Sequence, residues 1–205
     1  MKRTLFLIPL IILNCSTAVI TIDKTDMGPI KSIAIAPFFS EAGIGPAAIA
    51  ETENAFREVF LKLGYNIIEQ DKIESMLRDE EFSATGITQK NIQRAGKILG
   101  ADAILFGVIT EYKEETRIIR PSGRFGLLIH DREHKKTEYK TFYRFRVLVK
   151  LASTADSSVI MTAANRYPEA EHDDYMPAFV SLEAYRRYVC RKTGEEIIQK
   201  IQSGE

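Results

Sequence analysis

The sequence predicts an α/β protein with one folded domain, and three observations support that prediction. Short apolar runs alternate with amphipathic segments through the first 110 residues, as in chains whose strands and helices follow one another. Residues 139–151 then alternate between two faces, which is the period of a β-strand. Hydrophobic residues make up 45% and charged residues 27% of the 205 residues, which is typical of a globular domain and excludes a disordered or polytopic membrane chain.

The first half of the domain is predicted to follow the order β-α-β-α-α-β. Residues 31–38 are nearly continuous in apolar side chains, as expected for a strand buried on both faces. Pro46 suits the first turn of a helix, and Gly64 is placed to end that helix in a left-handed conformation. The predicted elements are a strand at 31–38, a helix at 46–63, a strand at 65–69, a short helix from 71, a helix at 88–99 and a strand at 103–110. Their short connections favour a mainly parallel sheet covered by helices.

The second half is predicted to form an antiparallel hairpin and a C-terminal helix. A charged strand at 111–120 precedes the alternating strand at 139–151, which turns into a strand at 159–167, and the helix starts at about residue 178. One face of the alternating strand is basic with Phe142 interleaved, a pattern that could contact nucleic acid. Pairing with acidic residues of the neighbouring strand is the alternative, at Glu111, Glu114 and Glu115. We expect the pairing and no nucleic-acid partner.

Charge and cysteine content exclude several classes of protein. Lys plus Arg and Asp plus Glu both number 28, so the formal net charge is zero, whereas a polyanion binder usually carries a basic excess. Two cysteines without recurring Cys/His spacing exclude a disulfide scaffold and a zinc ribbon. Cys190 lies in a helical pattern beside Tyr188 and Val189, which indicates a packing residue rather than a nucleophile.

The N-terminus has the organisation of an export signal. Lys2 and Arg3 precede an apolar run at residues 5–13, which is too short to span a membrane and fits a signal peptide. The run ends in Ile12-Leu13-Asn14-Cys15, which resembles the lipobox of bacterial lipoproteins, although Asn14 fits only the relaxed lipoboxes found in spirochaetes. The resemblance implies acylation of Cys15. We therefore expect a signal peptide at 1–14, a flexible tether at 15–30, a single α/β domain at 31–202 and no cofactor besides the covalent lipid.

Several stretches of the predicted domain resemble one family. They are residues 33–38, 64–73, 76–80, 86–87 and, most specifically, 96–112, which include the run Gly-Lys-Ile-Leu-Gly-Ala-Asp. These stretches resemble the periplasmic lipoproteins of the curli-secretion (CsgG) type, with the related activators of penicillin-binding proteins and the N-terminal domain of TolB. The resemblance implies a three-layer, anticodon-binding-domain-like sandwich that makes protein contacts rather than catalysing a reaction. Gly100 ends a helix and Asp102 opens a turn in this stretch, so both have a structural explanation.

The resemblance also implies a location and a kind of partner. We expect a non-catalytic, membrane-anchored protein of the cell envelope, at the outer membrane, that binds a protein or envelope component in assembly, secretion or activation. Curli-secretion channels insert long hairpins into the membrane, but the corresponding region at 111–139 is highly charged, which argues against a pore. Its short apolar tip, with Phe125, Leu127 and Leu128, is the predicted partner contact. The sequence leaves the partner's identity and any homo-oligomer open.

An enzyme or small-ligand carrier is the alternative function. Residues 43–48 fit the G-x-G-x-x-A pattern of dinucleotide binding, with Gly43 and Gly45 before a helix and Glu69 at the end of the next strand. Four residues separate the first strand from these glycines, which favours a simple loop entering a helix. Asp131 with His130 and His134, joined by the run at 172–174, could imitate a metal site, but a solvated charged surface is the default for such stretches. We expect neither catalysis nor a metal.

Overall fold

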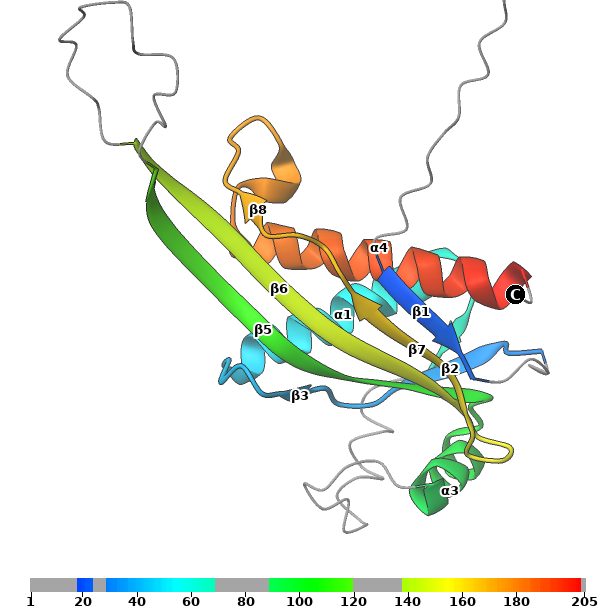
Figure 1. The fold of residues 1–205 in the computed structure, drawn as a ribbon. Helices are drawn as coiled ribbons and strands as arrows, with labels where there is room; N and C mark the ends of the chain where they lie inside the picture. The colour runs from blue at the N-terminus through cyan, green and yellow to red at the C-terminus, as the bar shows by residue number, and fades with distance from the viewer. Residues whose placement is uncertain (1–17, 24–28, 69–88, 120–137, 204–205) are drawn as a thin grey trace, which may run out of the picture.

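The computed structural model describes residues 18–23, 29–68, 89–119 and 138–203 (Figure 1). The strands are β1 (Ala18–Ile22), β2 (Ser32–Ile35), β3 (Phe39–Ser40), β4 (Asn66–Ile67), β5 (Ala103–Ile119), β6 (Glu138–Ser153), β7 (Val159–Asn165) and β8 (Ala170–Glu171). The helices are α1 (Pro46–Lys62), α3 (Gln89–Leu99) and α4 (Leu182–Ser203), with a 3-10 turn, η1 (Pro177–Phe179), before α4. The α/β prediction is confirmed. The predicted short helix from residue 71 lies outside the described residues.

The strands of the described part form one mixed sheet in the order β1-β7-β6-β5-β2-β4. Strand β2 runs parallel to β4 and β5, while β5, β6, β7 and β1 pair antiparallel in succession. The parallel pairing predicted for the first half is therefore confined to one edge, because the long hairpin and β1 supply the rest of the sheet. Two small strands complete it, with β3 beside β5 and β8 beside β6.

Helices lie on both faces of the sheet, which gives three layers. Helices α1 and α4 cover one face and enclose the main core, where Phe56, Phe60 and Val189 pack against Leu105 and Phe145. Helix α3 covers a smaller core on the other face, formed by the residues Ala34, Ala36, Ile92, Ala95, Ala101, Ile104 and Ala152. The alternation of side chains along β2 explains this division, since Ile33 and Ile35 face the main core while Ala34 and Ala36 face α3.

Strand β1 differs from the sequence-based expectation. Residues Ala18–Ile22 lie within the predicted tether, yet they pair with β7 from Ala18 opposite Asn165 to Ile22 opposite Met161. Ala18 is buried, and Ile20 and Ile22 pack against the main core. A short segment can do this because β7 presents an open edge whose backbone groups need partners. The described sheet therefore starts only three residues after Cys15.

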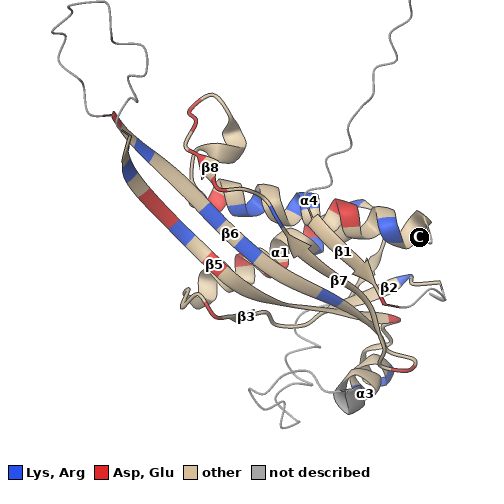
Figure 2. Cartoon of the chain, viewed as in Figure 1, with Lys and Arg blue, Asp and Glu red and all other residues tan. Residues whose placement is uncertain are grey.

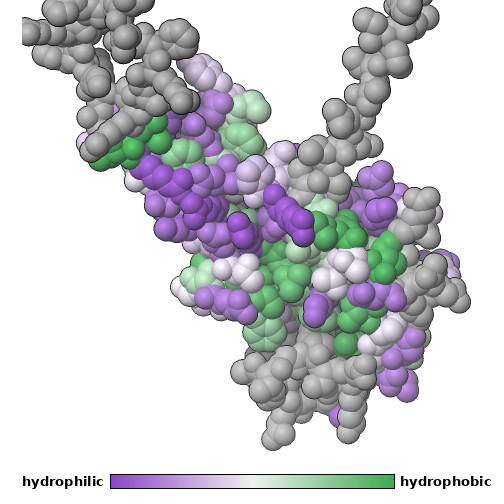
Figure 3. Space-filling model, in the orientation of Figure 1, coloured by the Kyte–Doolittle hydropathy of each residue, from purple (hydrophilic) through white to green (hydrophobic). Residues whose placement is uncertain are grey.

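The strand pair β5–β6 is one long hairpin that extends well beyond the rest of the sheet (Figure 1). Its register runs from Ala103 opposite Ser153 to Ile119 opposite Glu138, with one irregularity between Ile109 and Glu111. The predicted strands at 103–110 and 111–120 are thus one continuous strand with a bulge. The bulge divides the hairpin into an inner half, next to the rest of the sheet, and an outer half that extends beyond it. On the sheet face that α1 and α4 do not cover, the inner half is hydrophobic and the outer half is hydrophilic (Figure 3).

The turn between α3 and β5 confirms structural roles for two predicted residues. Gly100 has φ +66°, the left-handed conformation that ends α3. Asp102 accepts the backbone N–H groups of Lys31 and Ser32, both at 2.9 Å, and the Ser32 hydroxyl at 2.9 Å. Burial acts to raise the pKa of Asp102, but these hydrogen bonds stabilise the carboxylate and hold its pKa below the usual range. Asp102 therefore ties the start of β5 to the start of β2.

Candidate functional site

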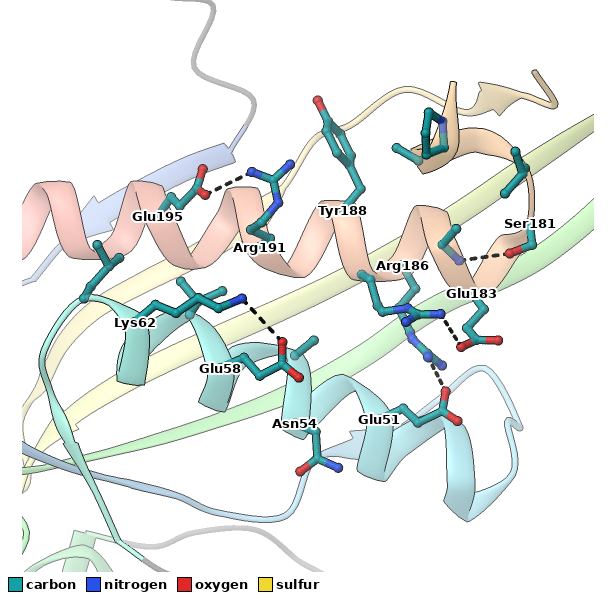
Figure 4. A pocket seen from close by; sticks show the side chains of 18 residues that line it. Glu51, Asn54, Glu58, Lys62, Ser181, Glu183, Arg186, Tyr188, Arg191 and Glu195 are labelled. Carbon is teal, nitrogen blue, oxygen red and sulfur yellow. Dashed lines mark hydrogen bonds and ion pairs between the residues drawn. The ribbon is translucent and has the colours of Figure 1, made fainter. Parts of the chain in front are cut away.

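A groove with a volume of about 910 Å³ lies between α1 and α4 (Figure 4). Helix α1 forms one wall, α4 the other, and η1 closes the end near Pro177. The helices pack closely because α4 has Gly194 at the contact: a Cβ there would lie 2.9 Å from Val59 Cγ1. The groove lies beside this close contact and extends to η1.

Apolar side chains line the inside of this groove. Val59 and Ala184 lie within it, and Leu63 and Val180, which are 44% and 40% exposed, border it. Tyr188 also lines the groove, and its ring projects from α4 away from α1 (Figure 4). Exposed apolar side chains that surround a hollow are characteristic of surfaces that bind other molecules.

Charged side chains on both helices form the rims of the groove, and they pair with one another. On α1, the Lys62 ammonium lies 3.7 Å from Glu58. On α4, Arg187 lies 2.6 Å from Glu183 and Arg191 lies 3.0 Å from Glu195. The dashed lines in Figure 4 show these pairs along the two helices. Each pair is exposed and adds little to stability, but together they leave the rims without net charge.

Arg186 connects the two helices beneath the groove. Its side chain is 1% exposed, its Nη2 pairs with the Glu51 carboxylate of α1, and its Nη1 donates to the Ala48 carbonyl at 3.4 Å. The guanidinium also lies 5.9 Å from the ring centroid of Tyr112. Its Nε has no hydrogen-bond partner among the described residues. A buried cation of this kind fixes the relative position of α1 and α4, because moving them apart would leave the charge unpaired.

Two buried titratable groups of α4, the Tyr185 hydroxyl and the Cys190 thiol, are held in their neutral forms. Burial raises the pKa of Tyr185 to about 12, and its hydroxyl donates to the Pro168 carbonyl. Burial also raises the pKa of the Cys190 thiol, which is fully buried in the main core. A thiol without solvent access and with a raised pKa is a poor nucleophile. The packing role predicted for Cys190 is therefore confirmed.

A second hollow, of about 740 Å³, lies between β8 and η1. At its edge the Tyr143 oxygen lies 2.7 Å from His172 Nδ1, and His172 Nε2 lies 2.9 Å from an Asp174 carboxylate oxygen. Burial raises the pKa of Tyr143, so its hydroxyl keeps its proton. The chain of contacts holds the segment after β8 against β6. Among the described residues, no cluster of His, Cys, Asp and Glu could hold a metal ion.

The predicted site residues are distributed between the described and undescribed parts of the chain. Gly43, with φ +67°, and Gly45, the residue before α1, lie in a loop beyond β3, and an added Cβ at either would meet nothing within 4 Å. The other predicted residues lie outside the described residues: Glu69, Cys15, Phe125, Leu127 and Leu128. No described contact therefore joins the two glycines to Glu69.

The basic face of β6 has the ion pairs expected from the sequence (Figure 2). Arg144 and Arg146 lie 3.5 Å and 3.0 Å from Glu111, and Arg144 lies 3.8 Å from Glu115. The expectation for Glu114 is wrong, because Glu114 lies opposite Tyr143 and so points to the other face of the hairpin. Glu169, just before β8, binds both Arg117 and Arg144, each at a shortest distance below 3 Å. The basic face is thus neutralised by its neighbours.

Sequence reasoning missed the groove and Arg186. The groove joins helices whose contacting residues, Glu51 and Arg186, lie 135 positions apart, so no local pattern indicates it. Arg186 did carry a signal, because it interrupts the apolar stripe of Tyr185 and Val189 on α4 and a buried arginine requires a partner. Among the described residues, no helix is both long and apolar enough to span a membrane.

Comparisons with known proteins gave similarities in structure. The chain is similar to lipoprotein GNA1162 from Neisseria meningitidis, with 11% identity, 84% of this chain and 98% of that chain covered, and a TM-score of 0.49. It is similar to PelC, a dodecamer from Paraburkholderia phytofirmans, with 10% identity, coverages of 86% and 93%, and a TM-score of 0.48. It is also similar to the LpoB C-terminal domain from Salmonella enterica, with 8% identity, coverages of 73% and 87%, and a TM-score of 0.39. No protein-family model and no curated protein matches the sequence.

Proposed function

We propose that this protein is a non-catalytic, lipid-anchored protein of the bacterial cell envelope that binds an amphipathic helix of a protein partner between α1 and α4. The observation that carries the proposal is the pairing of charges around an apolar groove. Each cation of the rims already has a carboxylate partner, while Leu63 and Val180 supply exposed apolar surface. A partner therefore gains apolar contact without having to neutralise a charge.

A helix is the partner element that the groove dimensions favour. Helix α1 has 17 residues, which corresponds to a length of about 25 Å at 1.5 Å per residue. A partner helix of similar length would lie along the groove and place apolar side chains at positions i, i+3 or i+4, and i+7 on its floor. The pairs at the rims would then border the polar side of that helix, as the rim of an interface does.

The proposed anchor rests on the N-terminal pattern and on the family resemblance. The apolar run at 5–13 ends at Cys15, where acylation would occur, and residues 31–112 resemble curli-secretion-type lipoproteins. The resemblance supports a role in envelope assembly, secretion or activation, and Ser16 after the cysteine suits sorting to the outer membrane in enteric bacteria. Several acyl chains would hold the protein on the membrane, since each buried CH₂ contributes about 0.8 kcal/mol.

Two leucines near the end of α1 provide a matched test of the groove. Leu61 and Leu63 are both exposed, at 51% and 44%, but only Leu63 lines the groove. With a photo-crosslinking residue at Val180 of the full-length protein in native membranes, we expect a discrete crosslinked product with an envelope protein. Leu63→Asp should abolish it, and Leu61→Asp should leave it unchanged. A product that persists in Leu63→Asp would contradict the groove as the binding site.

Intact mass tests the anchor separately. We expect protein extracted from native membranes to have the mass of residues 15–205 plus acyl chains, and Cys15→Ala to lack the acyl chains. An unacylated mass would remove the anchor from the proposal.

The contact predicted at Phe125, Leu127 and Leu128 remains a second place for a partner. Replacing all three with Ser should leave folding intact and abolish partner capture if they form that contact. Unchanged capture would leave the groove as the binding surface.

A further inference from the structure

The start of the folded domain lies very close to the proposed lipid anchor. Three Cα–Cα steps join Cys15 to Ala18, the first residue of β1, and at 3.8 Å per step they span at most about 11 Å. A tether over residues 15–30 would have allowed a separation of roughly 50 Å. If Cys15 carries the acyl chains, as the proposed function requires, the domain cannot move away from the bilayer surface.

Two neighbouring elements, β7 and α4, hold the start of β1 against the domain. On one side, β1 pairs with β7 along all five of its residues. On the other, the Ala18 N–H donates to the Glu196 carboxylate of α4 at 3.0 Å, and Tyr167 donates to the other oxygen of that carboxylate at 3.4 Å. Five paired residues in the sheet resist fraying. The chain therefore leaves the domain at a fixed position and in a fixed direction on its way to the anchor.

Basic side chains and one exposed apolar side chain lie near that point, on β1, after β7 and on α4. Val19, the second residue of β1, is 39% exposed. Arg166 is exposed and directly follows Asn165, the residue that pairs with Ala18. Lys192 and Lys200 lie one helical turn on either side of Glu196, whose carboxylate binds Ala18, so the helical period places them on that face of α4. We refer to Val19, Arg166, Lys192 and Lys200 as the β1 collar.

The charges of the collar are available for an external anion. The side chains of Arg166 and Lys200 have no hydrogen-bond or ion-pair partner in the part of the chain that the structure describes, whereas the Lys192 ammonium lies 3.2 Å from Glu195. The nearby Glu196 carboxylate is occupied by Ala18 and Tyr167. Basic side chains next to a membrane attach to anionic headgroups with about 1 kcal/mol each, and their aliphatic stems lie along apolar surface.

We propose that the β1 collar is a membrane-contact surface that places Arg166 and Lys200 among anionic phospholipid headgroups. The occupant is the bilayer, because the chain between Cys15 and Ala18 is too short to place any other surface of the bilayer-anchored domain closer to the headgroups. The contact sets the orientation of the domain, and with it the direction in which the groove between α1 and α4 opens. The inference rests on the proposed lipid anchor.

Depth-dependent quenching on the acylated full-length protein tests the proposal. Because Cys190 is fully buried and Cys15 would be acylated, an engineered Val19→Cys provides the one accessible thiol for a fluorescent label. In vesicles of phosphatidylcholine and phosphatidylglycerol with a headgroup nitroxide, we expect strong quenching at position 19. A label at Glu58→Cys, on the exposed side of α1, is the control and should be quenched several-fold less.

Two further variants separate the tether from the charges. A Gly-Ser insertion of about ten residues between Thr17 and Ala18 adds about 18 Å of root-mean-square reach, and it should lower quenching at position 19. The double variant Arg166→Glu with Lys200→Glu should lower quenching in phosphatidylglycerol vesicles, while Lys62→Glu should not.

The outcomes distinguish this inference from the proposed function. Equal quenching at positions 19 and 58 in protein of acylated mass would overturn the collar and leave the anchor intact. Quenching that the charge variant does not alter would also overturn the assignment of Arg166 and Lys200 to headgroups. An unacylated mass would overturn the anchor, and the collar with it.

Discussion

The two halves of the β5–β6 hairpin share one register but differ in how their faces are used. In the inner half, both faces carry apolar side chains: Leu105 and Val149 face the main core, and Val108 and Leu148 face the other side. In the outer half, one face still carries core residues such as Phe145, but the other carries ion pairs. The same backbone ladder therefore supports a buried sheet at one end and a solvated arm at the other.

The difference shows that the bulge at Ile109 to Glu111 separates two environments. Before it, the period-two pattern keeps Ile109 and Leu105 in the main core. After it, Tyr112 occupies that face and Glu111 moves to the face of Arg146. The bulge adds one residue to β5, and this exchanges the faces of all residues that follow on that strand. As a result, Glu111 faces solvent and Tyr112 faces the core.

The largest effect on the free energy of unfolding should come from truncating a phenylalanine on the buried face of the outer half, compared with one on its exposed face. Phe145, which is 1% exposed, and Phe142, which is partly exposed, lie three positions apart on β6 and face opposite sides. Phe145→Ala should lower the free energy of unfolding by about 3–5 kcal/mol, because it removes a buried ring and leaves a cavity. Phe142→Ala should cost far less, since its ring remains partly in water beside Arg117. Urea unfolding of both variants measures the difference.

Equal losses for the two variants would mean that the outer arm is buried on both faces, and that the ion pairs of β6 do not face water.

The sequence predicted those faces because they follow from local alternation. Alternation over residues 139–151 predicts one shared face for Tyr139, Thr141, Tyr143, Phe145, Val147, Val149 and Leu151. The last five are buried, whereas Tyr139 and Thr141, near the outer end of β6, are exposed and partly exposed. Strand β1 was not predicted, because a five-residue segment is stabilised by the edge of β7, which lies about 140 residues later in the chain. Glu114 was assigned to the wrong face because a bulge cannot be detected from alternation alone. Non-local pairing limits what the sequence reveals.

The candidate site was less predictable than the fold. The groove depends on how α1 and α4 lie against the sheet, and on Gly194 allowing close contact with Val59. The glycines that did attract attention, Gly43 and Gly45, have open space around them. The sequence does not distinguish a glycine required for close packing from a glycine in an open loop. The atoms around each glycine in the fold do.

The inner half of the hairpin should be sensitive to added volume. A Cβ at Gly107 would lie 2.7 Å from the Phe38 ring and 2.9 Å from the Leu148 carbonyl oxygen. Gly107→Ala should therefore lower the free energy of unfolding by about 1–3 kcal/mol through overpacking. Adding Phe38→Leu should relieve the contact with the ring but not the contact with the backbone, so a double-mutant cycle should show partial compensation. Full additivity of the two losses would contradict this steric account.

The smallest effect should appear in the charged face of the outer half, as a dependence on pH. The hydrogen bond from Arg117, followed by that from Lys113, lowers the pKa of Glu115 from 4.5 to about 2. A pKa that is lower in the folded state stabilises the fold above the unfolded value near 4.5, and this contribution is lost as the pH falls towards 2. Glu115→Gln should therefore lower the unfolding midpoint at neutral pH, and the difference from the wild-type chain should shrink between pH 4.5 and pH 2.

Salt and a neighbouring residue sharpen this last prediction. The pairs around Glu115 are solvent-exposed, so high salt at neutral pH should reduce the effect of Glu115→Gln. Glu114→Gln is the matched control: it removes the same charge one position earlier, from the opposite face, where Glu114 makes no ion pair with a described residue. A pH profile shared by both variants would mean that net charge, rather than pairing with Arg117, governs the arm. A profile confined to Glu115→Gln would show that the outer face is held by its own ion pairs, whereas the inner face is held by apolar contact.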